Sequence, residues 1–74
     1  METVKADLGA NVWKVLVAPG DTVEEDSTLM ILESMKMEIP VLAECSGQIE
    51  SVHVTEGGTV EAGDPLVAIS PDGS

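Results

Sequence analysis

Short runs of apolar residues, many of them β-branched, alternate with turn residues along the whole chain. The runs Val12–Val17, Thr22–Val23 and Leu29–Glu33 are separated by Gly, Pro and Asp residues. Short strands with this punctuation are typical of a small sandwich or barrel. No stretch has the three- and four-residue spacing of an amphipathic helix. We therefore predict an all-β protein with a helix content near zero.

The chain repeats itself after 37 positions. In this register the following residues align: Gly20 with Gly57, Thr22 with Thr59, Val23 with Val60, Val15 with Val52, Val17 with Val54, and Leu29 with Leu66. One copy runs from about residue 4 to 33 and the other from about residue 41 to 70. Two four-strand units with one apolar face each can bury those faces only against each other. We therefore predict a flattened β-barrel or sandwich of two four-stranded antiparallel sheets, related by a pseudo-twofold axis.

Each copy contains a break in its alternating pattern. Val15 and Val17 alternate as a strand requires, but Val12 falls on the opposite parity. A β-bulge adds one residue to a strand and restores the parity on its far side. We therefore predict bulges near residues 13–14 and, in the second copy, 50–51.

Glycines follow the predicted strands where the chain must turn. Gly20, Gly57 and Gly58 stand at positions where a turn requires positive φ, which glycine adopts without steric cost. Residues 71–74 read Pro-Asp-Gly-Ser and contain no apolar side chain that could pack. We therefore predict one domain over residues 1–70 and a disordered tail over 71–74.

The segment between the two copies has no counterpart in the repeat. It reads Ser-Met-Lys-Met-Glu-Ile-Pro over residues 34–40. The last strand of the first copy and the first strand of the second are predicted to form a hairpin with Met35 and Lys36 at its tip. Tight two-residue turns need positive φ at both central residues and therefore favour Asn-Gly or Asp-Gly. A turn that carries Met and Lys instead indicates a functional demand that overrides local preference.

The charge balance excludes several classes of partner. The chain has 14 acidic and 3 basic residues and a formal net charge of −11. Because the basic residues are only Lys5, Lys14 and Lys36, no cluster can neutralise the phosphates of a nucleic acid or bind an anionic membrane. No apolar run approaches the roughly 20 residues of a membrane span. We expect a soluble monomer.

The first residues and the single cysteine predict the compartment. The chain begins Met-Glu-Thr-Val-Lys, which has neither the basic nor the apolar region of a secretory signal. Cys45 has no second cysteine with which to form a disulfide. We therefore expect a cytoplasmic protein.

The small size limits what chemistry the chain can perform. With 74 residues it is one domain, and a chain of this size buries only about 60% of its unfolded surface. Trp13 is the only aromatic residue, so the core must consist of Val, Ile, Leu and Met. The sequence contains no Ser/His/Asp set, no paired-carboxylate cleft and no cluster with metal-ligand spacing. We predict a protein that is not an enzyme by itself.

The junction between the copies resembles a known attachment motif. Residues 33–38, Glu-Ser-Met-Lys-Met-Glu, are similar to the biotin-attachment motif of biotin carboxyl carrier domains. Further similarity lies in the elements around Gly20 and Gly57, in Leu29 before the motif and in Gly47 after it. The resemblance spans almost the whole chain and is closest to the small free-standing biotin/lipoyl attachment proteins.

This resemblance implies a fold and a function. The implied fold is a flattened β-barrel of two four-stranded antiparallel sheets. The implied cofactor is biotin, joined to Lys36 through an amide, with Met35 and Met37 read by a biotin protein ligase. The implied role is a carrier of carboxybiotin between a biotin carboxylase and a carboxyltransferase.

Two positions depart from the pattern. Ala10 stands where the second copy has Gly47, and Asp26 stands where it has Gly63. Both positions lie at turns, so the turn geometry there is open.

Alternatives remain at this stage. Lys36 could carry a lipoyl group, or the chain could be an unmodified β-barrel interaction module. Met35 or Met37 could point inward as core filler, because methionine adapts to irregular gaps. A copper site would need the soft ligands of the chain, which are Met30, Met35, Met37, Cys45 and His53.

Overall fold

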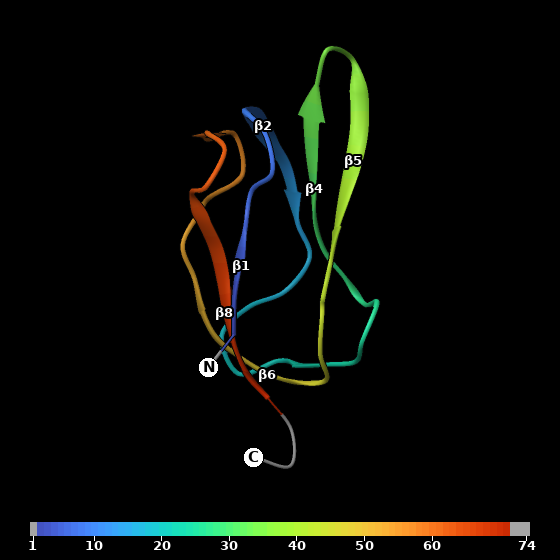
Figure 1. Ribbon diagram of the computed structural model, residues 1–74, viewed down its shortest axis with the longest axis vertical. Coiled ribbons are helices and arrows are strands. Elements are labelled where there is room, and N and C mark those ends of the chain that lie inside the picture. Colours follow the sequence, from blue (N-terminus) through green and yellow to red (C-terminus); the bar gives the residue numbers. More distant parts are fainter. Residues whose placement is uncertain (1, 72–74) are drawn as a thin grey trace.

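The computed structural model describes residues 2–71 as eight β-strands without an α-helix (Figure 1). The strands are β1 (Glu2–Lys5), β2 (Ala10–Val15), β3 (Thr22–Val23), β4 (Thr28–Ser34), β5 (Met37–Leu42), β6 (Gly47–Val52), β7 (Thr59–Val60) and β8 (Pro65–Pro71). The predicted all-β class is confirmed. Strand β8 extends through Pro71, one residue beyond the predicted domain boundary, and the rest of the predicted tail lies outside the described residues.

The strands form two antiparallel sheets of four strands each. One sheet has the order β1-β8-β6-β3 and is here called the terminal sheet; the other has the order β5-β4-β2-β7 and is called the hairpin sheet. Moving each strand four places along the chain turns one order into the other. The predicted pseudo-twofold repeat therefore relates the two sheets as wholes. They share no strand, so the molecule is a flattened sandwich rather than a closed barrel.

The predicted bulges are present in both copies. The register of β2 on β4 shifts between Val12 and Lys14, and that of β6 on β8 shifts between Ile49 and Ser51. Each bulge lets residues on its two sides face the core, although their sequence parity differs. Trp13 is the extra residue of the first bulge and lies outside the core.

Turn geometry agrees with the prediction except at one glycine. Gly20 and Gly57 have φ of 95° and 87°. Gly58 does not adopt positive φ, so the prediction for it was wrong: its N–H donates to Thr55 O at 3.0 Å within a tight turn that the preceding glycine already opens. Gly63 and its counterpart Asp26 both have positive φ, at 91° and 71°, so this turn is the same in the two copies.

The core lies between the sheets and is aliphatic, as predicted. Leu29 and Leu66 occupy equivalent positions in the two copies and are both fully buried. Burial of such a side chain contributes about 1.5–3 kcal/mol. The other fully buried large side chains are Met30, Leu32, Ile69, Val12 and Val67. No helix capable of spanning a membrane occurs in the described part of the chain.

Candidate functional site

The junction between the two copies forms a hairpin with a two-residue turn. Strands β4 and β5 pair from Thr28 and Leu42 up to Ser34 and Met37, which leaves Met35 and Lys36 as the turn. Their φ angles are 53° and 67°. Positive φ at both central residues is the signature of the type I′ turn, whose backbone twist matches that of the flanking strands. The predicted conflict between the turn and its residue types is therefore real, since each such residue costs about 1–2 kcal/mol.

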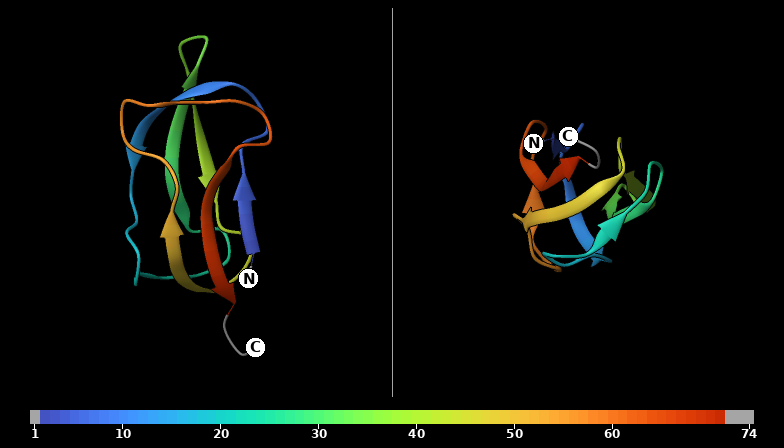
Figure 2. Two further views of the ribbon diagram at one scale, coloured as in Figure 1. Left: turned by 90° about the vertical axis from the view of Figure 1, so that its left-hand side faces the viewer. Right: turned by 90° about the horizontal axis from the view of Figure 1, so that it is seen from below.

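The tip of the hairpin projects beyond the rest of the molecule. Figures 1 and 2 show the turn between β4 and β5 at one end of the long axis, beyond the neighbouring strands. The pairing of β2 with β4 ends at Asn11 and Glu33, so Ser34 is paired with Met37 alone. In the other sheet the strand equivalent to β4 stays paired to its end, where Pro71 lies opposite Gly47.

The Lys36 side chain is exposed and has no partner among residues 2–71. No hydrogen bond or ion pair joins its amine to another described residue. An attachment lysine needs an accessible amine on a flexible stem, held at a rigid position. The exposed Lys36 amine on a paired hairpin therefore meets the requirements for attachment of a group through an amide bond.

Both flanking methionines lie largely exposed, outside the core. Met35 is 92% exposed and Met37 65% exposed. The interpretation of either methionine as core filler is therefore wrong. Met37 continues the inward parity of Ile39, but it lies above the level at which the opposite sheet could cover it. Large apolar side chains exposed at this level have no packing role within the described residues.

Two glutamates face each other directly below the turn. Glu33 and Glu38 are paired across the hairpin, and both side chains are exposed. Like charges directly opposite each other on one sheet face are destabilising. The hairpin therefore combines a strained turn, exposed methionines and facing carboxylates within six residues.

The methionine, cysteine and histidine side chains that a copper site would need lie in different surroundings. Met30 is fully buried between the sheets, whereas Met35 is almost fully exposed. Cys45 is half-buried against the core, and His53 Nε2 lies 3.1 Å from Ser51 Oγ. Among the described residues no three His, Cys, Asp or Glu side chains gather closely enough to hold a metal ion.

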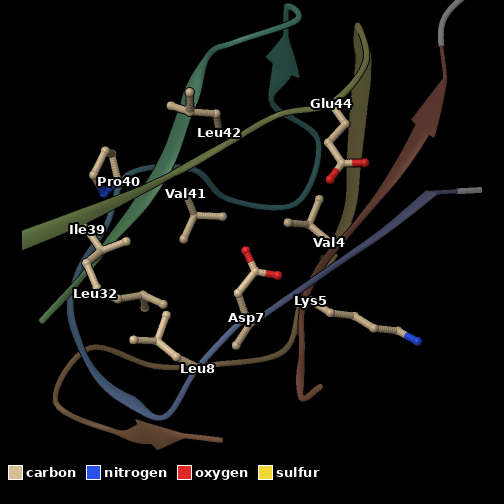
Figure 3. A pocket seen from close by; sticks show the side chains of 11 residues that line it. Val4, Lys5, Asp7, Leu8, Leu32, Ile39, Pro40, Val41, Leu42 and Glu44 are labelled. Atoms are coloured by element: carbon tan, nitrogen blue, oxygen red, sulfur yellow. The ribbon is translucent and has the colours of Figure 1, made fainter. Parts of the chain in front are cut away.

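A cavity of about 140 Å³ opens between the edge strands β1 and β5 (Figure 3). Its lining consists of Val4, Lys5, Ala6, Asp7, Leu8, Leu32, Ile39, Pro40, Val41, Leu42 and Glu44. Lys36 is not part of this lining. The Lys36 side chain therefore stands free at the hairpin tip rather than inside this cavity.

Comparison with known proteins identifies the family. Residues 2–69 match the family described as "Biotin-requiring enzyme". The chain belongs to this family. Its family and fold make it a biotin carboxyl carrier-type domain, whose cofactor is covalently attached biotin. The resemblance that rests on residues 33–38 is thereby confirmed.

Individual relatives support the same assignment. The chain is 47% identical over 68 residues to the biotin carboxyl carrier protein of Streptococcus mutans, covering 92% of this chain and 52% of that protein. It thus spans about half the length of that relative. It is 46% identical to the biotin/lipoyl attachment protein of Bacillus subtilis, covering 92% of this chain and 93% of that protein.

A solved structure agrees in fold. The urea carboxylase of Kluyveromyces lactis contains a segment that superimposes with a TM-score of 0.87 at 35% identity. The match covers 93% of this chain and 6% of that much longer one.

Proposed function

We propose that biotin is attached to Lys36 and that the domain carries carboxybiotin from a biotin carboxylase to a carboxyltransferase. The observation that supports this assignment is the exposed Lys36 at a projecting two-residue turn with positive φ. Attachment forms an amide between Lys36 Nζ and the carboxyl group of biotin. The bicyclic ring then supplies the one-carbon chemistry, and this chain supplies none.

The residues of the hairpin hold and present the arm. The β4–β5 pairing fixes the Lys36 backbone, while the lysine stem keeps its rotational freedom. Acylation removes the positive charge of the amine and shifts the formal net charge from −11 to −12. A tethered arm of this kind reaches distant active sites at high effective concentration.

We further propose that the biotin protein ligase reads Met35 and Met37. These two side chains flank the amine and are exposed, so they offer an apolar contact on each side of it. The ligase, the biotin carboxylase and the carboxyltransferase are the proposed partners, and the cytoplasm is the proposed compartment. The domain acts as a non-catalytic carrier.

Lys36 is the subject of the first prediction. We expect the purified chain, incubated with biotin protein ligase, biotin and ATP, to gain the mass of one biotinyl group. Peptide mapping should place that group on Lys36. Lys36→Arg should abolish the gain, because an arginine cannot form the amide.

The other two lysines of the chain provide the matched control. Lys5→Arg and Lys14→Arg should be modified at the wild-type rate. A biotinyl group on either of them in the wild-type chain would contradict the proposal. A lipoyl increment on protein from its natural host would instead favour acyl transfer, and an unmodified mass after incubation with active ligase would leave the interaction-module alternative.

Met35 and Met37 carry a second prediction. Replacing each by Ala should lower kcat/KM for biotinylation by about tenfold, which corresponds to the loss of one buried apolar contact worth about 1.4 kcal/mol. Initial rates over a range of protein concentrations give this ratio. Leu16→Ala, which removes an apolar side chain that is 53% exposed and lies away from the tip, should leave the rate unchanged. Equal effects of all three variants would argue against specific recognition.

A further inference from the structure

The outer faces of the two sheets can be compared residue by residue, because the repeat gives every position a counterpart 37 residues away. In the hairpin sheet, Lys14, Ile31 and Pro40 form one row across β2, β4 and β5. In the terminal sheet, the row at the equivalent level is Ser51, Ala68 and Thr3. These are the residues 37 positions away, so the registers of the two sheets agree at this level.

The two faces differ sharply in chemistry. The hairpin sheet presents a set of large apolar side chains, here called the apolar face: Trp13, Leu16, Ile31, Pro40 and Leu42. Their counterparts in the terminal sheet are, in the same order, Glu50, His53, Ala68, Thr3 and Lys5. The exposed fractions of Trp13, Leu16 and Leu42 are 45%, 53% and 42%.

The side-chain directions place these residues outside the sandwich. Figure 3 shows Pro40 and Leu42 on one side of the β5 ribbon and Val41 on the other, toward Asp7 and Leu8. Trp13 is the bulge residue next to Lys14, whose amine lies 5.8 Å from the centre of the indole ring. The indole therefore lies on the outer surface next to Lys14, which pairs with Ile31.

Folding does not require large apolar side chains at these positions, since four of the five counterparts are polar and the fifth is the smaller Ala68. The terminal sheet has the same register with glutamate, histidine, threonine and lysine in their place. Exposed apolar side chains that gather on one face of a small protein mark an interaction site more often than they mark a structural need. The comparison between the two sheets thus indicates that the apolar face serves a function other than folding.

The position and charge of the apolar face indicate its partner. It lies in the sheet that carries the Lys36 hairpin, one row below the exposed Glu33–Glu38 pair. At its other end, the turn before β4 contains Glu24, Glu25 and Asp26, all exposed. An apolar surface between two acidic groups is complementary to an apolar surface flanked by basic side chains. A second copy is a poor match because its formal charge is also −11.

We propose that the apolar face docks the domain on its biotin carboxylase, so that the Lys36 arm is directed toward the active site. This inference rests on the proposed function. That enzyme must bind two anions, ATP and bicarbonate, and basic side chains around such a site provide the complementary charge. Docking through a sheet face leaves the hairpin tip free to move within the active site.

Binding of the biotinylated chain to its purified biotin carboxylase tests the proposal. The variant Trp13→Glu/Ile31→Ala introduces the two residues that the terminal sheet carries at the same positions. We expect its Kd to rise by at least about tenfold, because both side chains lie at the centre of the face. Leu42→Lys, on the neighbouring strand, should have the same direction of effect. The matched control Glu50→Ala/Lys5→Ala changes the counterparts of Trp13 and Leu42 in the terminal sheet and should leave Kd within about twofold.

The salt dependence of carboxylase binding tests the contribution of charge, and further measurements check the function and fold of each variant. Raising NaCl from about 0.05 to about 0.5 M should weaken binding of the wild-type chain, since the acidic ends of the face contribute by charge. The rate of Lys36 biotinylation reports separately on the proposed function, and thermal unfolding reports on the fold of each variant. Leu42→Lys replaces a half-exposed side chain at a sheet edge, so it remains informative if the double variant unfolds.

Three outcomes would overturn the proposal. Equal Kd values for the apolar-face variants and the terminal-sheet control would remove the face from the interface. A concentration-dependent dimer of the wild-type chain that Trp13→Glu/Ile31→Ala dissociates would assign the face to a second copy. Absence of biotinylation on Lys36, with carboxylase binding unaffected by any variant, would refute both the docking face and the proposed function.

Discussion

Met35 and Lys36 occupy a backbone conformation that suits neither of them. Both have positive φ, where the side chain of an L-residue approaches the following carbonyl oxygen. Asn and Gly would satisfy the same turn with less strain. Under the proposed function this strain is the consequence of presenting a lysine at the narrowest point of a hairpin. Stability and attachment then compete for the same two positions.

Replacing the dipeptide by its preferred residues tests this competition. Met35→Asn/Lys36→Gly should raise the free energy of unfolding by about 1–2 kcal/mol, because the strain of two residues in the left-handed region is relieved. Urea denaturation measures this change. Met37→Asn introduces the same side chain at an exposed strand position and should not stabilise. An unchanged or lower stability of the double variant would show that the turn is not strained.

At the scale of the strands, the two copies differ at one end of the central strand pair. Strand β4 separates from β2 there, whereas β8 stays paired with β6. A Cβ on Gly47 would collide with the carbonyl group of Ser70, because β8 lies against β6 up to Pro71. At the equivalent position in the first copy Ala10 is accommodated. There β4 has left β2, and Ser34 pairs only with β5. Thus the first copy carries Ala10, where β4 separates from β2, and the second carries Gly47, where β8 stays paired with β6.

The close approach of β8 to Gly47 predicts that a methyl group added at this position lowers the free energy of unfolding. Gly47→Ala should lower the free energy of unfolding by more than about 2 kcal/mol, since backbone atoms of β8 must move. Gly9→Ala is the matched control: its nearest neighbour would be Val60 O at 3.7 Å, an ordinary contact, so little change is expected. Denaturation of both variants in urea compares them. A small effect at Gly47 would mean that β6 and β8 separate more easily than their pairing indicates.

The repeat made the two four-stranded sheets, their bulges and the hairpin predictable, whereas the order of strands within each sheet came only from the structure. Paired positions such as Val12 and Ile49 located both bulges, since a parity change has one simple structural solution. The hairpin followed from the junction between the copies. The exposure of Met37 did not follow, because its parity is that of a core residue and only the height of the opposite sheet decides burial. Gly58 was missed because a pair of glycines does not indicate which one opens the turn.

At the scale of the whole molecule, charge is the dominant property. A formal charge of −11 is confined to a body whose extents are 38 × 17 × 17 Å. Among residues 2–71 nearly all acidic side chains are exposed to water. Repulsion among these carboxylates opposes the compact state.

Salt should therefore stabilise this protein. Increasing NaCl from about 0.05 to about 0.5 M shortens the Debye length from about 14 Å to about 4 Å, so repulsion between carboxylates is screened. We expect the Tm to rise over this range in calorimetry or circular dichroism. Sucrose at matched osmolality controls for general solvent effects. A Tm that falls with NaCl would indicate that attractive pairs dominate.

The ends of the described chain meet far from the lysine. Glu2 lies opposite Ile69, and the described ends of β1 and β8 stand at the end of the long axis away from the hairpin tip (Figures 1 and 2). A linker fused at either end would therefore attach to the domain at the end opposite Lys36. The 38 Å body would add its whole length to the radius that the linker sweeps. For any assembly built around it, this domain is a rigid extension of the linker, and under the proposed function that extension sets how far the Lys36 arm reaches.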